Sequence, residues 1–312
     1  MIVVSGASGY VGSYIARQLV EKGETVRGMV YNRQRAEREG RLQGLPVEWI
    51  EADVTRPDTL PAVMQDATAV IHTVAIAIEK GGRNYEAFNY QGTVNIVDAA
   101  KAAGVRRFIN ISQLGADASL PYRFLASKGK AQDYVAASGL DWTAFRPSAI
   151  WGPEDDFANS FARLIPLTPL IFPVVGDQNS RFQLVWVGDV ASSVVQALHD
   201  PQTIGKVYEL GGPEILTLEE IERRTLQALG KRRWLLPFPM SVLKFFVAVM
   251  EGFLPNPPVT RSLLELLQVS NVTVKNGLDY FIQNPRPFTP ENTAAYMRQF
   301  RVGQTLSQFF SR

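Results

Sequence analysis

A glycine pattern close to the start of the chain constrains its fold more than any other feature. A strand-like run at residues 2–5, apolar except for its final serine, is followed by Gly6, Gly9 and Gly12, and a helical pattern runs on to residue 22. In a strand–turn–helix unit, the first glycine permits a tight turn, the second lets the backbone approach a pyrophosphate, and the third lets the helix pack closely on the sheet. The start of such a helix attracts phosphate groups. The pattern therefore predicts a nicotinamide dinucleotide site rather than an ordinary glycine-rich turn.

The first half of the chain alternates short β-branched runs with helical patterns, as βαβ units do. Strands are predicted at residues 2–5, 25–30, 47–51, 69–72, 107–111 and 142–146, and helices at 10–22, 85–103 and from 124 to about 139. Parallel strands joined by right-handed crossovers build a sheet with helices on both faces. The pattern therefore predicts an α/β fold with a doubly wound parallel Rossmann sheet.

The pattern becomes irregular after Pro147. A strand-and-helix stretch returns at 182–198, a strand is predicted at 206–210, and a helix follows the capping box that Thr217 and Glu220 form. We expect a smaller, mostly helical C-terminal part beside the sheet. The predicted dinucleotide-binding Rossmann core comprises residues 1–150, together with residues 182–212, which return to it. The predicted substrate- or partner-facing part comprises residues 151–181 and 213–312.

The composition excludes several classes of protein. The 312 residues include no cysteine, which excludes disulfides, thiolate catalysis and cysteine-ligated metals. The 32 basic and 30 acidic residues give a net charge of +2, which is too balanced for a nucleic-acid-binding protein. His72 and His199 cannot build a typical zinc site, and acidic residues 154–156 are expected to form a solvated loop, so no metal site is predicted. Without a secretion signal or a bilayer-spanning run, the chain is expected in the cytoplasm.

The residues after the second predicted strand bear on the choice of cofactor. An NAD site usually carries an acidic residue there, whereas an arginine accommodates the 2′-phosphate of NADP. This chain has no acid at that point but carries Arg33 and Arg35, which favours NADP(H) and leaves NAD(H) open. Asp53 and Val54, after the third predicted strand, are placed to meet the adenine, although Asp53 also suits a turn.

At this point the sequence resembles the atypical and extended short-chain dehydrogenase/reductases, an NAD(P)-binding, epimerase/dehydratase-like group. The resembling segments are Asp53–Val54, Asn95, Asn110–Ser112, Ser127–Lys130, Arg146–Pro153, Val187–Ala191 and Tyr208–Pro213. Within that group the chain is most similar to the branch of the nucleotide-binding accessory subunit of mitochondrial complex I. Residues 255–260 and the leucine-rich 263–267 support that branch.

The resemblance implies a set of cofactor-binding residues. They are Gly6, Ser8, Gly9, Tyr10, Val11, Gly12, Arg33, Asp53, Val54, Val74, Lys128 and Pro147.

The departure from the group lies at its catalytic motif. Active members carry Tyr-x-x-x-Lys with an upstream serine, and the tyrosine supplies the proton. Here Ser112 and Lys128 are present, but Phe124 stands at the tyrosine position and Tyr122 lies two residues earlier. The resemblance therefore implies an NADP(H)-holding accessory or assembly factor of a membrane complex of respiratory type, with impaired catalysis. The alternative is an NADP-dependent reductase of an apolar substrate, such as a quinone, lipid or isoprenoid, in which Lys128 or water replaces the tyrosine.

The segment 231–254 combines a basic entry with an apolar helix. Lys231, Arg232 and Arg233 precede residues 240–254, whose few polar or small positions fall on one narrow helical face. A wide apolar face suits a membrane surface or a membrane protein complex as partner, at the inner face of the membrane. A helix buried against the C-terminal part is the alternative.

Overall fold

The computed structural model describes residues 1–174, 180–238, 240–253, 264, 267 and 269–300. The predicted landmark at 255–260 and most of the one at 263–267 lie outside the described residues. The chain forms two compact units. The first is Met1–Pro147, Val187–Leu210 and Lys275–Asn284, and the second contains the described residues of Ser148–Trp186, Gly211–Val274 and Pro285–Arg312.

The first unit is built on a seven-stranded sheet in which each neighbouring pair is parallel. Its order is β11-β6-β5-β4-β1-β2-β3. The strands are β1 (Ile2–Ser5), β2 (Val26–Val30), β3 (Val47–Glu51), β4 (Ala69–His72), β5 (Arg107–Ile111), β6 (Asp141–Pro147) and β11 (Lys206–Leu210). From β1 the chain adds successive strands toward one edge of the sheet, and from β4 it adds them toward the other edge. This reversal of strand order between β1 and β4 confirms the predicted doubly wound Rossmann sheet.

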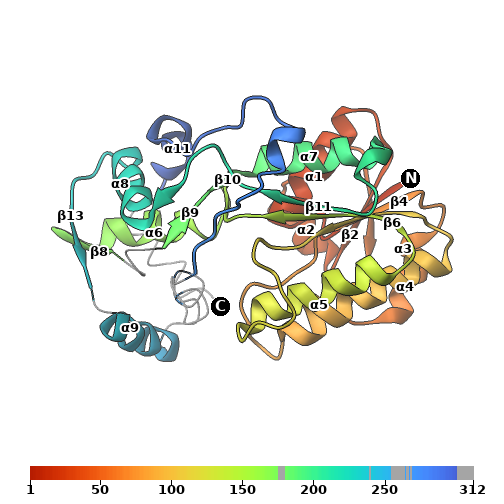
Figure 1. Cartoon of the computed structure of the whole chain (residues 1–312), viewed down its shortest axis with the longest axis horizontal. Coiled ribbons are helices and arrows are strands. Elements are labelled where there is room, and N and C mark those ends of the chain that lie inside the picture. Colours follow the sequence, from red (N-terminus) through yellow and green to blue (C-terminus); the bar gives the residue numbers. More distant parts are fainter. Residues whose placement is uncertain (175–179, 239, 254–263, 265–266, 268, 301–312) are drawn as a thin grey trace. The chain divides into compact units, whose positions relative to one another are not determined.

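Helices cover both faces of this sheet (Figure 1). They are α1 (Tyr10–Glu21), α2 (Arg33–Glu39), α3 (Leu60–Met64), α4 (Gly92–Ala102), α5 (Arg123–Ala137) and α7 (Val187–His199). Helices α1 and α7 pack on each other, whereas α4 packs on both α3 and α5. The apolar side chains of Val3, Val70 and Phe108 are fully buried against Ile96 and Val97 of α4. Each such buried side chain stabilises the fold by roughly 1.5–3 kcal/mol, so the strand ends that carry the site rest on a well-packed core.

The long helix predicted at 85–103 is divided in two. A π-helical turn, η2 (Glu86–Gln91), precedes α4. π-helical turns are rare and often lie at functional sites.

Residues 275–284 belong to the first unit, although the sequence pattern groups them with the C-terminal part. Gly277 donates its backbone N–H to the Glu209 carbonyl at 2.7 Å. The ring of Phe281 lies 5.5 Å from that of Phe145 and 5.0 Å from that of Tyr208, between centroids. Aromatic packing therefore fixes this segment beside β11 and β6.

The second unit consists of helices and short strand pairs. The helices are α6 (Ala158–Leu164), α8 (Leu218–Ala228), α9 (Met240–Phe253) and α11 (Pro290–Met297). The strand pairs are β7 (Ile150–Trp151) with β10 (Val185–Trp186), β9 (Arg181–Phe182) with β12 (Leu216–Thr217), and β8 (Ile171–Val174) with β13 (Trp234–Pro237). The capping box of Thr217 and Glu220 at the start of α8 is confirmed. Within the described part of the chain, no helix has the length and apolar character needed to cross a bilayer.

Candidate dinucleotide site

The glycine turn after β1 has a geometry that only glycine allows. Gly6 adopts a φ of +76°, a left-handed conformation that side chains rarely adopt. A Cβ on Gly12 would lie 2.2 Å from the carbonyl oxygen of Gly6, so α1 approaches the turn more closely than any side chain permits. The hydroxyl of Thr73, after β4, donates to the Ser5 carbonyl at 2.6 Å and supports the turn from the neighbouring strand.

The start of α1 suits an anion. Gly9 is its N-cap residue and has no side chain to cap the first turn, and no acidic residue stands in that turn. An uncapped helix start presents backbone N–H groups and the positive end of the helix dipole. The residues present therefore fit a pyrophosphate.

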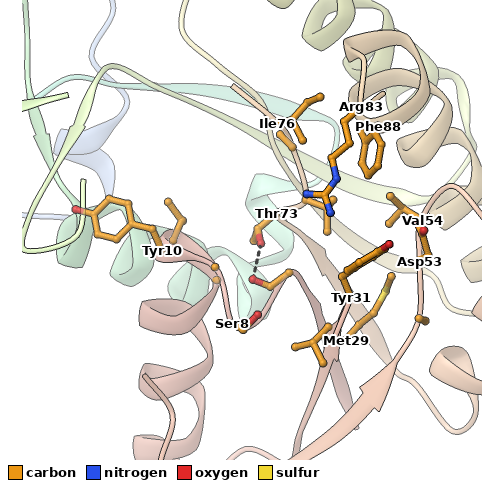
Figure 2. A pocket seen from close by; sticks show the side chains of 18 of the residues that line it. Ser8, Tyr10, Met29, Tyr31, Asp53, Val54, Thr73, Ile76, Arg83 and Phe88 are labelled. Carbon is orange, nitrogen blue, oxygen red and sulfur yellow. Dashed lines mark hydrogen bonds between the residues drawn. The ribbon is translucent and has the colours of Figure 1, made fainter. Parts of the chain in front are cut away.

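A cavity of about 550 Å³ opens from this turn, at the point where the strand order reverses (Figure 2). Its lining comes from the ends of β1, β2, β3 and β4 and from the loop after β4. The lining residues are Gly6, Ser8, Gly9, Tyr10, Val11, Gly12, Met29, Val30, Tyr31, Arg35, Ala52, Asp53, Val54, Thr73, Val74, Ala75, Ile76, Ala77, Arg83 and Phe88. In a sheet of this order, ligands bind at this crevice.

One wall of the cavity is fixed by a single amide side chain. Asn89, in the π-helical turn, accepts a hydrogen bond from the Ile76 backbone N–H at 2.8 Å and donates to the Ile76 carbonyl at 3.1 Å. The Asn89 side chain is fully buried and also donates to the Ser127 hydroxyl at 3.2 Å. The Asn89 amide therefore makes the pair of backbone hydrogen bonds with the loop after β4 that a neighbouring strand would otherwise make.

The far end of the cavity carries the residues predicted to meet adenine. Asp53 and Val54 both line it. The Asp53 carboxylate also accepts hydrogen bonds from the backbone and hydroxyl of Thr55, each at 2.8 Å, so Asp53 is a turn residue as well. The side-chain amide of Asn95, a residue of the resemblance, donates to the Val54 carbonyl at 2.7 Å and holds that segment in place.

The two predicted phosphate-binding arginines differ in position. Arg33 is not among the lining residues, and its guanidinium pairs with Glu37 at 2.8 Å on the surface of α2. Arg35 lines the cavity and pairs with Glu39 at 2.7 Å. The sequence does not separate them, because both precede a glutamate at the i,i+4 spacing of a helix.

Lys128, Ser112 and Pro147 lie outside this lining. The Lys128 ammonium is buried and donates to the Ile111 carbonyl at 2.7 Å, at the end of β5. Burial lowers the pKa of Lys128 to about 8. The buried hydroxyl of Ser112, the next residue, has no hydrogen-bond partner among the described residues. The lysine and the serine therefore stand together at the end of β5, and Pro147 ends β6 beside it.

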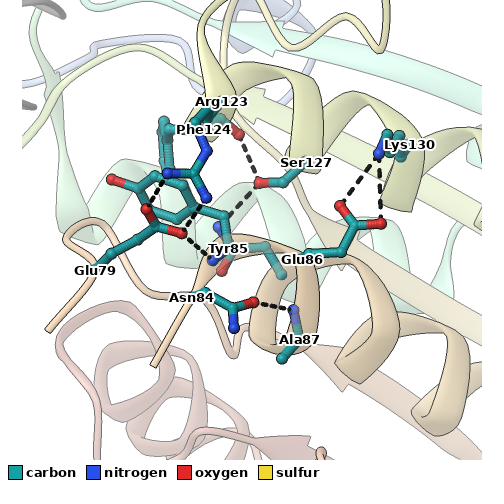
Figure 3. A network of polar contacts seen from close by, with 10 residues as sticks. Glu79, Asn84, Tyr85, Glu86, Ala87, Arg123, Phe124, Ser127 and Lys130 are labelled. Carbon is teal, nitrogen blue, oxygen red and sulfur yellow. Dashed lines mark hydrogen bonds and ion pairs between the residues drawn. The ribbon is translucent and has the colours of Figure 1, made fainter. Parts of the chain in front are cut away.

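The partly buried Phe124 lies beside a polar network that ties α5 to the loop after β4 (Figure 3). Its ring packs edge-on against Tyr85, with centroids 5.6 Å apart. Arg123 pairs with Glu79 at 2.7 Å, and the Glu79 carboxylate also accepts the Tyr85 backbone N–H at 2.9 Å. Tyr122 is the N-cap residue of α5, so it does not take the place of residue 124.

His72 is a buried structural residue. Its Nδ1 lies 2.7 Å from the Ser5 hydroxyl, and its Nε2 lies 3.1 Å from the Thr93 hydroxyl. Because that threonine hydroxyl donates to the Asn89 carbonyl at 2.7 Å, Nε2 carries the proton and Nδ1 accepts from Ser5. Burial, and then the charge of Lys128, lower the pKa of His72 to about 3. His72 is therefore neutral at physiological pH.

The sequence predicts a solvated loop for the acidic residues 154–156. The structure corrects this prediction at Asp155, which is buried. Its carboxylate accepts the backbone N–H of Gly152 at 3.0 Å and that of Asn159 at 3.2 Å. Burial raises the pKa of Asp155 to about 7, although the backbone donors oppose the shift. Among the described residues, no group of three His, Asp or Glu side chains is placed to hold a metal ion.

Several lining residues were not predicted from the sequence. Met29, Thr73, Arg83 and Phe88 line the cavity because β2, the loop after β4 and η2 end at the same crevice. The one signal that identifies the loop is its position after the strand beside the glycine turn, where a Rossmann sheet reverses its order.

A parallel sheet of this order, with an uncapped glycine turn at its reversal point, defines a dinucleotide-binding Rossmann protein. The chain belongs to the NAD(P)H-binding family, whose sequence profile matches residues 6–201. This family assignment confirms the dinucleotide predicted from the glycine pattern.

Known proteins resemble the chain over most of its length. The mitochondrial NADH dehydrogenase (ubiquinone) 1 alpha subcomplex subunit 9 of Arabidopsis thaliana is 31% identical, over 86% of this chain and 69% of that protein. The photosystem II assembly factor Ycf39 of Trieres chinensis is 24% identical, over 90% of this chain and 86% of that protein. A nucleoside-diphosphate-sugar epimerase from Staphylococcus aureus shares the fold, with a TM-score of 0.74 and 19% identity over 96% of this chain and 99% of that one. The predicted resemblance to epimerase/dehydratase-like proteins is confirmed.

Proposed function

We propose that the protein holds NADP(H) as an accessory or assembly factor of a membrane complex of respiratory type, and that it lacks the usual carbonyl chemistry of short-chain dehydrogenase/reductases. One observation carries the loss of chemistry: Phe124 stands four residues before Lys128 on α5 and has no proton to give. The relatives support the accessory role, because one is named a subunit of NADH dehydrogenase and another a photosystem II assembly factor.

The nucleotide is proposed to lie along the cavity of the first unit. The pyrophosphate would rest on the glycine turn and the start of α1, and the adenine would face Asp53 and Val54. The absence of an acidic residue just after β2 favours NADP(H) over NAD(H), as Arg35 in the lining does. The proposed binding residues are Gly6, Ser8, Gly9, Tyr10, Val11, Gly12, Arg35, Asp53, Val54 and Val74.

The second unit is proposed to meet the membrane complex through α9. On one face of this helix, Leu243 and Val247 are buried in the core of the unit. On the other face, Phe245 is 67% exposed, Phe246 is 56% exposed and Phe253 is 82% exposed. Exposed aromatic side chains in such density mark partner or membrane contacts.

The charge near α9 supports the same partner. Lys231, Arg232 and Arg233 lie just before β13, whose Trp234 is 73% exposed. Basic residues beside apolar ones attract the anionic inner leaflet of a membrane by about 1 kcal/mol each. The protein is therefore proposed to act in the cytoplasm, peripheral to the inner face of a membrane.

A second candidate is an NADP-dependent reductase of an apolar substrate. The specific observation is Lys128, whose pKa of about 8 lets it exchange a proton near neutral pH. The unpartnered Ser112 hydroxyl next to it would orient a carbonyl.

The test is isolation of the tagged protein from membranes and from the soluble fraction, with identification of bound nucleotide and co-purifying proteins. The accessory role predicts NADP(H) and subunits of one membrane complex in the membrane fraction. The Phe253→Ser variant should keep the nucleotide and lose the complex. Recovery without nucleotide or partner subunits, or robust NADPH consumption by the pure protein, would overturn the proposal.

A further inference from the structure

The positively charged side chain best placed to bind a phosphate of the dinucleotide comes from the loop after β4 rather than from α2. The Arg83 guanidinium carbon lies 5.1 Å from the ring centroid of Tyr31 and 5.5 Å from that of Phe88 (Figure 2). Arg83 and both aromatic residues line the cavity. Cation–π attraction to two neighbouring rings holds a guanidinium in place without using its N–H donors, which can still bind a ligand.

The position of Tyr31 decides which part of the ligand Arg83 would meet. Tyr31 directly follows β2. The residue after the second strand of a Rossmann sheet lies at the adenine ribose, where NADP differs from NAD by its 2′-phosphate. A guanidinium held against Tyr31 therefore stands where that phosphate distinguishes the two cofactors. Arginine binds phosphate through two parallel N–H donors, which adds geometric specificity to charge.

The local sequence explains how Arg83 is presented. Gly81 and Gly82 have φ values of +60° and +82°, and the Arg83 backbone N–H donates to the Lys80 carbonyl at 3.1 Å. Two successive positive φ values make the tight turn that glycine pairs favour. The Glu79 carboxylate, bound to both Arg123 and the Tyr85 backbone, anchors the turn on either side (Figure 3).

The same contacts leave Arg83 available to an anion. Among the described residues no ion pair of Arg83 is found, and Glu79, the acidic residue of its loop, is paired with Arg123. Arg33 and Arg35, by contrast, each have a glutamate partner on α2. Arg33 is also outside the cavity lining.

We infer that Arg83, held by cation–π contacts with Tyr31 and Phe88, is the residue that recognises the 2′-phosphate of the bound dinucleotide and sets its preference for NADP(H). This inference rests on the proposed function, since it requires a dinucleotide in the cavity. It moves the specificity role that the sequence pattern assigns to Arg33 and Arg35 to the residue that follows Gly81 and Gly82.

The test is titration of the full chain with NADPH and NADH, and with 2′,5′-ADP and 5′-AMP as fragments. Arg83→Ala should weaken NADPH and 2′,5′-ADP binding by about 10- to 100-fold, the range of a lost charge-assisted contact, and change NADH and 5′-AMP binding by less than about threefold. Arg83→Lys should recover part of the loss. Arg38→Ala removes one charge from α2 outside the cavity lining and serves as the matched control.

Several outcomes would overturn the inference. Equal losses for NADPH and NADH would make Arg83 an adenine-stacking residue instead. A loss confined to Arg33→Ala or Arg35→Ala would return the role to α2. If the wild type binds both dinucleotides and Arg83→Ala leaves both unchanged, the inference fails while the proposed function stands. If the wild type binds neither, both fail together. Thermal unfolding checks that each variant is folded.

Discussion

The ring of Phe124 packs edge-on against the ring of Tyr85, 5.6 Å between centroids, at the helical position where active relatives are expected to carry a tyrosine. The contact joins α5 to the loop that forms one wall of the cavity. Residue 124 thus has a packing role that does not depend on proton transfer. This relationship makes the loss of the tyrosine testable by substitution.

We expect the purified protein to show little NADPH turnover with generic carbonyl substrates. Phe124→Tyr restores a phenol four residues before Lys128, so any gain in turnover should require that lysine and disappear in the Phe124→Tyr/Lys128→Met double variant. Phe124→Leu is the control, because it keeps an apolar side chain and should leave nucleotide affinity nearly unchanged. Robust wild-type turnover that Ser112→Ala abolishes would establish the reductase instead.

Gly12→Ala should abolish dinucleotide binding. The added Cβ would lie 2.2 Å from the Gly6 carbonyl oxygen, so either the turn or α1 must move. Overpacking of this kind costs roughly 1–3 kcal/mol of stability, which thermal unfolding would detect. Gly252→Ala is the matched control, because no atom lies within 4 Å of the position of its Cβ. Tight NADPH binding by Gly12→Ala would show that the phosphates do not rest on this turn.

Two substitutions on α9 separate its exposed face from its buried face. Phe245→Glu should leave the unfolding temperature nearly unchanged and lower binding to anionic liposomes or to the partner complex. Val247→Glu, two residues on, places a charge at a side chain that is 3% exposed and should unfold the second unit. Binding should also weaken as salt concentration rises. If Phe245→Glu binds membranes and partner as the wild type does, α9 is not the contact surface.

The burial of Asp155 predicts a pH dependence of stability. Its pKa is raised to about 7 in the folded chain from an ordinary value of 3.8, so the folded state holds the proton more tightly. The contribution is therefore full below about pH 4 and is lost as pH rises to about 7. We expect the free energy of unfolding of the wild type, relative to Asp155→Asn, to fall by on the order of 2 kcal/mol between pH 5 and pH 8.

Denaturant titrations of both proteins at several pH values measure this difference. His72 and Lys128 have lowered pKa values and shift stability in the opposite sense with pH, but they do so in both proteins and cancel from the comparison. Parallel curves for the two proteins would show that Asp155 is ionised in the folded chain at pH 5.

The features that sequence predicts here are those set by local chemistry. The turn at Gly6 and Gly12 is predictable because no other residue type fits its geometry. The strands are predictable because short apolar runs that alternate with helical patterns form the buried strands of a βαβ series. The position of Arg83 is not, because it depends on Glu79 pairing with Arg123, which is 44 residues away along the chain.

Other departures have equally specific causes. Arg33 follows β2 as expected for a phosphate ligand, but Glu37 lies one helical turn on and takes its guanidinium. Asp155 is polar and lies in a loop, so its sequence suggests exposure, yet backbone donors from Gly152 and Asn159 make burial tolerable. In both cases a contact partner that the local sequence does not specify determines where the side chain lies.

The paired hydrogen bonds between Asn89 and the backbone of Ile76 have a consequence for how such chains can diverge. They fasten the wall of the cavity before the loop reaches the turn at Gly81 and Gly82. Residues 80–83, which follow the anchoring Glu79, are therefore expected to tolerate changes of length or composition without displacing that wall. If Arg83 sets the cofactor preference as inferred above, a substitution in this short turn changes that preference while the wall that Asn89 holds stays in place.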